Sequence, residues 1–249
     1  MKRIISVAIA MILVSAAWAG ASAQTLQDTL QQVGRGYQGM GRGMGGCVDP
    51  DTILAQFDYQ ELSQEEIDNL LHMRGEEKLA RDVYLTLSET WKLPVFRNIP
   101  RSEQRHCNAV KALLTKYKLD DPYVDDTVGV FADATFTNLY NELVATGRTS
   151  LIDALTVGAI IEDLDLVDLE NALAQTDNLD IQFVYQNLSK GSRNHLRAFV
   201  RLLRRFGVSY TPRYLDMDTY QDIINSPKER GYVYDDQGKK SFLCGRKPQ

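Results

Sequence analysis

The chain has 249 residues, a formal net charge of −5 at pH 7 and 44% hydrophobic residues. We exclude nucleic acid as a partner, because its phosphates attract Lys and Arg and this acidic chain has no basic stripe. The length suits one domain with tails, or at most two small domains.

Residues 1–23 have the features of a signal peptide. The first three residues are basic at Lys2 and Arg3, residues 4–19 are almost wholly apolar, and Ala21-Ser22-Ala23 matches a signal-peptidase site. We therefore predict cleavage after Ala23 and an exported protein, periplasmic or extracellular, with no membrane span once the signal is removed. An uncleaved N-terminal anchor is the alternative, since the apolar run is nearly long enough to cross a bilayer.

Residues 24–60 are predicted to form a Gly-rich flexible linker, because glycines crowd residues 34–46. Residues 34–39 match the dinucleotide fingerprint G-x-G-x-x-G. No strand pattern precedes this match and no helix pattern follows it, so we reject a nucleotide site.

The three cysteines permit one disulfide in an exported protein and leave one thiol. Cys47 and Cys244 flank the expected domain, whereas Cys107 lies inside a predicted helix. We expect the disulfide to join Cys47 to Cys244.

Helical periodicity dominates residues 61–226, and no segment of five or more residues alternates convincingly with period two. The sequence therefore predicts an all-α fold, followed by a polar C-terminal tail at residues 227–249. Capping signatures mark two helix starts, at Ser63 with Glu66 and at Ser150 with Asp153. The four long helices are expected at residues 63–91, 102–117, 150–173 and 178–206, with short helices near 135–145 and within 210–226. Pro94 and Pro100 are expected in a loop, and the Asp163-Leu164-Asp165-Leu166 alternation suggests a break in the third long helix.

Each long helix places a candidate metal ligand on its apolar face: Glu77, Glu103 with His106, Glu162, and His195. Residues three apart share one helix face, so Glu103 and His106 point the same way. An unpaired buried carboxylate costs several kcal/mol, and three in one bundle would also repel each other. Two divalent cations would resolve this, and iron, manganese or zinc suit oxygen and imidazole ligands.

Two motifs resemble those of a known class. Glu77-Lys78-Leu79-Ala80-Arg81-Asp82-Val83-Tyr84 resembles the Glu-x-x-Ala-Arg-x-x-Tyr of the first helix in rubrerythrin-type, ferritin-like proteins. Glu103-Gln104-Arg105-His106 resembles their second-helix motif. From about residue 60 to 225, the chain is similar to an exported uncharacterised family called domain of unknown function 2202. The similarity includes the run Gly191-Ser192-Arg193-Asn194-His195-Leu196-Arg197-Ala198-Phe199.

The resemblance implies a ferritin-like four-helix bundle with a crossover that contains a short extra helix. It also implies an iron-linked oxidase, ferroxidase or peroxidase that uses di-iron or mononuclear iron and acts on O2 or peroxide. A homodimer is left open. One residue departs from the pattern: Ser192 stands where a bridging glutamate is expected, three residues before His195. Asp163 and Glu76 are the candidate substitutes, although neither lies cleanly on an apolar stripe, and without one the site would hold an unequal metal pair, one ion or none.

Each ligand has a structural alternative. Glu103 and His106 would form an ion pair, or Glu103 would favour the helix N-terminus. Glu77 would form a salt bridge with Arg81, or Glu76 would take its place; Glu162 would be solvated, and His195 would be a hydrogen-bonded core residue. Tyr84 and Tyr185 would either contact a bound ligand or carry a radical, or be core residues. His72 is expected at the surface. At the level of function the alternatives are a non-catalytic metal-binding protein and a metal-free interaction domain of the cell envelope.

Overall fold

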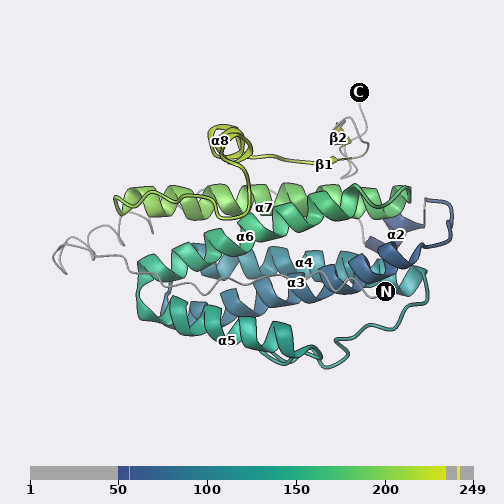
Figure 1. Ribbon diagram of the computed structural model, residues 1–249, viewed down its shortest axis with the longest axis horizontal. Helices are drawn as coiled ribbons and strands as arrows, with labels where there is room; N and C mark the ends of the chain where they lie inside the picture. Colours follow the sequence, from purple (N-terminus) through teal and green to yellow (C-terminus); the bar gives the residue numbers. More distant parts are fainter. Residues whose placement is uncertain (1–49, 56, 234–239, 242–249) are drawn as a thin grey trace.

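The computed structural model describes residues 50–55, 57–233 and 240–241 (Figure 1). Its helices are α2 (Pro50–Leu54), α3 (Gln64–Thr90), α4 (Pro94–Lys116), α5 (Ala134–Thr149), α6 (Leu151–Leu173), α7 (Leu179–Arg205) and α8 (Met217–Asn225). The two strands, β1 (Tyr232–Val233) and β2 (Lys240–Ser241), pair antiparallel. The all-α prediction is confirmed.

Parts of the sequence-based prediction lie outside the described residues. They are the signal peptide, residues 24–49 of the linker, the Cys47–Cys244 disulfide and most of the tail beyond residue 233. Helix α2 falls within the expected linker, so residues 50–54 of that segment are helical. None of the helices in the described part is both long and apolar enough to span a membrane.

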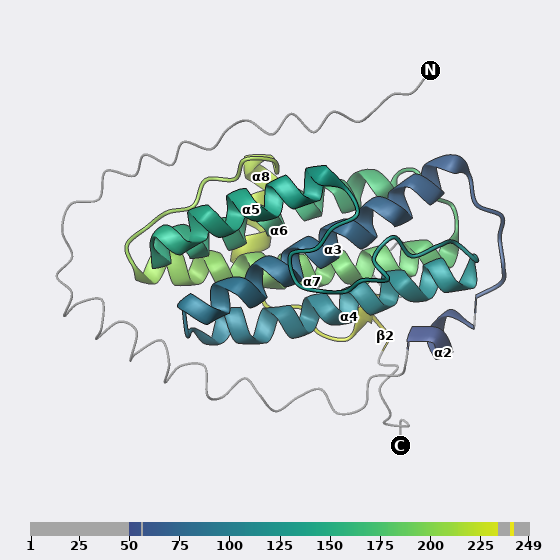
Figure 2. The ribbon, with the colours of Figure 1, turned by 90° about the horizontal axis from the view of Figure 1, so that it is seen from below.

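The four long helices form two hairpins that pack against each other (Figures 1 and 2). Residues 91–93 join α3 to α4, and residues 174–178 join α6 to α7. Helix α3 also contacts α6, and α4 contacts α7, so all four helices enclose one interior. Between the hairpins, the chain crosses over and forms α5, which lies against α3 and α6, whereas α8 lies outside α7 (Figure 1).

The start of α3 is fixed by the predicted capping box. Ser63 Oγ accepts a hydrogen bond from the Glu66 amide, and the Glu66 carboxylate accepts one from the Ser63 amide at 2.8 Å. The other Glu66 oxygen accepts hydrogen bonds from Thr176 and Asn178. The cap therefore also ties α3 to the connection between α6 and α7.

Helix α4 begins at Pro94, about two turns earlier than predicted, so the expected loop over Pro94 and Pro100 is wrong. Proline suits the first helical position because its missing N–H has no helical partner there. Pro100 lies inside the helix and removes one N–H from the ladder, while Phe96 and Ile99 beside it are buried in the core. Glu103 is consequently well inside the helix, which rules out its N-terminal capping role.

Helix α6 is continuous through the Asp163-Leu164-Asp165-Leu166 alternation, so the predicted break is wrong. Asp163 is fully buried, and its carboxylate accepts hydrogen bonds from the Tyr210 hydroxyl and from the amides of Arg213 and Leu215. These bonds satisfy the buried charge and attach the segment after α7 to α6.

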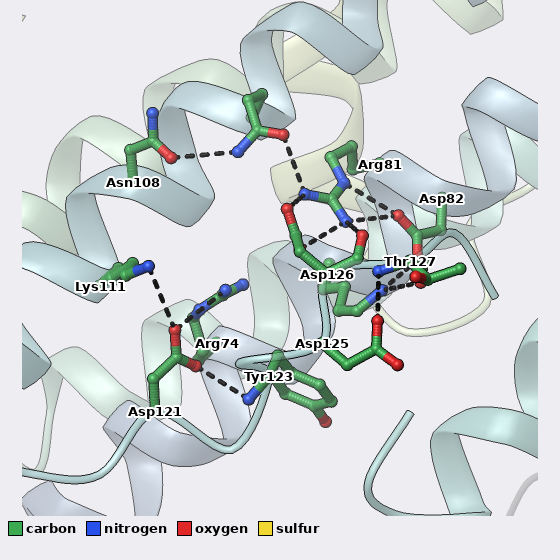
Figure 3. A network of polar contacts seen from close by, with 12 residues as sticks. Arg74, Arg81, Asp82, Asn108, Lys111, Asp121, Tyr123, Asp125, Asp126 and Thr127 are labelled. Atoms are coloured by element: carbon green, nitrogen blue, oxygen red, sulfur yellow. Dashed lines mark hydrogen bonds and ion pairs between the residues drawn. The ribbon is translucent and has the colours of Figure 1, made fainter. Parts of the chain in front are cut away.

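A buried charge network attaches the crossover to α3 (Figure 3). Lys78 Nζ lies 2.5 Å from Asp82 Oδ2 and donates to the Thr127 carbonyl at 2.9 Å. Arg81 pairs with Asp82 and makes two 2.8 Å hydrogen bonds to the Asp126 carboxylate. The salt bridges of Arg81 thus go to aspartates, and the alternative salt bridge from Arg81 to Glu77 is wrong.

Candidate metal centre

The five predicted ligands meet in the interior enclosed by the four long helices. Glu77 comes from α3, Glu103 and His106 from α4, Glu162 from α6, and His195 from α7, and all five are buried. They form two groups, Glu77 with Glu103 and His106, and Glu103 with Glu162 and His195. Within each group the candidate ligand atoms lie within 4.8 Å of one another. Glu103 belongs to both groups.

The two oxygens of Glu103 face different imidazoles. Oε2 lies 2.8 Å from His106 Nδ1, and Oε1 lies 2.8 Å from His195 Nδ1. Each imidazole nitrogen also faces a second carboxylate, Glu77 at 3.1 Å from His106 and Glu162 at 3.4 Å from His195. The rings are stacked with their centroids 5.7 Å apart. Glu103 therefore has the position of a ligand shared by two neighbouring ions.

Unpartnered atoms show that the cluster suits cations. Glu77 Oε1, Glu103 Oε1 and His195 Nδ1 are buried and have no hydrogen-bond partner among the described residues. Glu103 Oε1 and His195 Nδ1 lie close together, yet without hydrogen-bond geometry. Buried polar atoms nearly always have a partner. Divalent cations, one in each group, would provide a partner for all three atoms. Carboxylate oxygen and imidazole nitrogen suit iron, manganese and zinc.

The charges within the cluster shift the pKa values of its members. Burial works against the charged form of His106, but the charges of Glu77 and Glu103 outweigh it and raise its pKa to about 10. The pKa of His195 is likewise raised to about 10, against burial, by Glu103 and Glu162. Burial raises the pKa of Glu77 to about 7. In metal-free protein, protons on the imidazoles therefore supply the positive charge.

The two tyrosines differ in their relation to the cluster. Tyr84 donates a 2.6 Å hydrogen bond to Glu162 Oε1, and burial together with the Glu162 charge raises its pKa well above the usual value. Tyr84 is thus a neutral phenol that orients Glu162. Tyr185 lies in a separate apolar cluster with Leu70 and Leu188, which agrees with a core role.

Asp165 occupies the place next to Ser192. The Ser192 hydroxyl donates to Asp165 Oδ2, and both side chains are buried. Burial, followed by the charges of Glu77 and Glu76, raises the pKa of Asp165 well above its usual range. The sequence prediction missed this residue, although its signal was present: Asp165 follows Glu162 by three residues and so shares its helix face.

The two expected substitutes for the missing glutamate have other partners. Asp163 binds the segment after α7. Glu76 faces His72, whose Nε2 lies 3.4 Å from Glu76 Oε1, and Asp168 completes this third group. The His72 side chain is 45% exposed, as a surface residue should be, so its ion pair contributes little to stability.

The backbone of α7 approaches His106 at Gly191. A Cβ atom there would lie 2.4 Å from His106 Cε1 and 2.5 Å from Nε2. We predict that Gly191→Ala displaces the imidazole and lowers the metal content from two ions to one per chain, with the Glu103, Glu162 and His195 group retained. Elemental analysis measures this.

Gly147→Ala is the matched control, because its Cβ would crowd Leu87, which is not part of the cluster. Both variants are expected to melt at a lower temperature, but only Gly191→Ala should lose metal. Equal metal content in the two variants would contradict the assigned role of His106.

The structure thus defines an all-α protein with buried carboxylate and histidine clusters that can hold metal ions. The chain belongs to the family described as "Uncharacterized protein domain (DUF2202)", whose profile matches residues 66–227. The similarity to domain of unknown function 2202 is therefore confirmed.

A relative of this chain is the uncharacterized protein MJ0754 of Methanocaldococcus jannaschii. It is 56% identical over 178 residues, which cover 72% of this chain and 96% of the relative. The crystal structure of hypothetical protein MJ0754 from Methanococcus jannaschii matches the fold with a TM-score of 0.68 at 55% identity. That match covers 69% of this chain and 98% of the other.

Proposed function

We propose that this chain is an exported ferritin-like protein whose four-helix bundle, within residues 61–226, holds two metal ions. Iron is the favoured metal, with manganese and zinc as alternatives, and the favoured activity is an iron-linked oxidase or peroxidase. The observation that carries the proposal is the position of Glu103, with one oxygen facing each imidazole. Di-iron carboxylate bundles have a glutamate on each of two helices and a Glu-x-x-His pair on each of the other two. This chain matches the pattern except at Ser192, which stands in place of the second pair's glutamate.

The ligands divide into two sets that share Glu103. Glu77, Glu103 and His106 would hold one ion, and Glu103, Glu162 and His195 the other. Asp165, beside Ser192, supplies the carboxyl group that the fourth helix lacks. With Asp165 ionised, four carboxylates balance two divalent cations, which removes the repulsion that these buried acids would otherwise have.

Bound iron would supply two electrons, one from each Fe²⁺, to O2 or peroxide. Reduction of hydrogen peroxide to two waters uses those two electrons and two protons. Tyr84 would keep Glu162 oriented through its hydrogen bond. The ligand carboxylates themselves are buried, since Glu77, Glu103 and Glu162 are each only 2% exposed.

Metal binding should release protons. At pH 7 both imidazoles of the metal-free protein are protonated, since the pKa of each is about 10, and each must lose its proton to bind a metal. We predict the release of at least two protons per chain. The product of the two metal-binding constants should then fall by at least about a hundredfold for each unit by which the pH is lowered.

Isothermal titration of Mn²⁺ or Zn²⁺ in two buffers with different ionisation enthalpies counts these protons. Binding without proton release, or an affinity independent of pH, would show that the imidazoles are not ligands.

Consumption of peroxide by iron-loaded protein, purified in its exported form, tests the activity. With excess Fe²⁺ added as the reductant, we expect continued peroxide consumption that disappears in Glu103→Ala. Metal binding without peroxide or Fe²⁺ consumption would instead support a non-catalytic metal-binding protein, the candidate favoured by Ser192 in place of the fourth-helix glutamate. Failure to bind metal would leave the metal-free interaction domain.

A further inference from the structure

An apolar cavity of about 420 Å³ lies between α3, α5 and α6 and reaches the metal cluster. Figures 1 and 2 show α5 next to α3 and α6 on one side of the protein. Glu77, Glu103 and Glu162 line the cavity, so it opens onto both proposed ligand sets. Interiors of proteins contain few voids larger than a water molecule, and the engineered cavity that binds benzene measures only about 150 Å³. A space of this size is large enough for a small organic ligand.

The cavity is elongated along α6. Its lining residues on that helix recur at helical spacing from Asp153 to Asp165, a span of about 18 Å at 1.5 Å per residue. At one end lie Asp153, which is half-buried, and Ala145 of α5, which is exposed. At the other end lies the buried Glu162. The cavity therefore extends from exposed lining residues, among them Ala145 and Glu142, to the metal centre.

The lining selects against anions. Its walls are mainly aliphatic, with Leu79, Leu143, Val157, Ile160 and Ile161 among them. Every charged residue in the lining is an acid, and the lining includes no Lys, Arg or His. Along the walls, a carboxylate or phosphate would have no cationic lining residue beside it and would face like charges, at a high desolvation cost. A neutral aliphatic chain, in contrast, buries its surface against these walls.

We propose that this cavity binds a neutral, unbranched aliphatic molecule that lies along α6 with one end beside Glu77 and Glu162. The placement of that end at the metal centre rests on the proposed function. Binding of the chain itself depends only on the cavity.

Calorimetric titration of metal-free protein with the straight-chain alcohols hexanol, octanol and decanol tests the binding. The affinity should rise about fourfold for each added methylene group, and decanoate should bind at least tenfold more weakly than decanol. Affinity independent of chain length, or decanoate binding as tightly as decanol, would overturn the proposal.

Two variants locate the binding site. The tryptophan of Ala145→Trp should block the exposed end of the cavity, and that of Thr156→Trp should occupy the cavity from its α6 side. Each variant is expected to weaken decanol binding at least tenfold. The matched control is Ala134→Trp, because Ala134 is also exposed on α5 but does not line the cavity. Unchanged decanol affinity in both cavity variants would overturn the proposal, and melting temperatures establish that the variants fold.

Nuclear magnetic resonance of decanol bound to Mn²⁺-loaded protein tests the orientation. We expect one end of the chain to be broadened much more than the other, and absent or uniform broadening would overturn the placement. The two proposals fail differently. Decanol binding without metal binding contradicts the proposed function, whereas metal binding without decanol binding contradicts this inference.

Discussion

Glu103→Ala is expected to contain less than about a tenth of a metal ion per chain, against about two in the unchanged protein. Glu103 is the one residue common to both ligand groups, and its oxygens lie 2.8 Å from the Nδ1 atoms of His106 and His195. Its removal therefore takes a ligand from each ion and leaves two buried imidazoles beside fewer carboxylates. Elemental analysis after reloading with Fe²⁺ under anaerobic conditions measures the loss.

Glu77→Ala is the matched control, because Glu77 belongs to one group only. This variant should keep one ion. Glu103→Gln preserves the side-chain volume and should lose metal as Glu103→Ala does, which separates ligand loss from poor packing. Two ions retained in both Glu103 variants would contradict the bridging assignment.

Asp82→Ala should lower the free energy of unfolding by about 3–5 kcal/mol, the usual cost of leaving a buried charge without its partner. Neither Lys78 nor Asp82 exposes any of its side chain to solvent, and Asp82 also accepts a hydrogen bond from the Gly129 amide. Loss of the carboxylate would leave the Lys78 ammonium uncompensated and remove one of the bonds that attach the crossover to α3 (Figure 3). Urea denaturation measures the effect.

Asp126→Ala is the control for this network. The Asp126 side chain is 48% exposed in its pair with Arg81, so its loss should cost only about 1 kcal/mol or less. Similar losses in Asp82→Ala and Asp126→Ala would mean that burial of the Lys78–Asp82 pair does not matter to stability.

Helical periodicity made much of this structure predictable. The capping residues Ser63 and Ser150 marked the starts of α3 and α6 within one residue. Polar residues that interrupt apolar stripes identified Glu77, Glu103, His106, Glu162 and His195, which the structure brings together. This worked because a helix of known period fixes which side chains share a face, and a buried carboxylate needs a compensating partner.

The errors arose where tertiary contacts decide the local structure. The burial of Phe96 and Ile99 keeps α4 helical through Pro100, against the preference of proline. Hydrogen bonds from the segment after α7 allow Asp163 to be buried inside α6. The cavity beneath α5 could not be predicted, because it depends on the separation between helices and not on the period of any one of them.

Anomalous X-ray scattering from iron-loaded crystals tests the central claim most directly. The two-metal centre predicts two iron peaks, one bound by Glu77, Glu103 and His106, and the other by Glu103, Glu162 and His195. Iron bound at other residues, or no iron in the interior enclosed by α3, α4, α6 and α7, would contradict it.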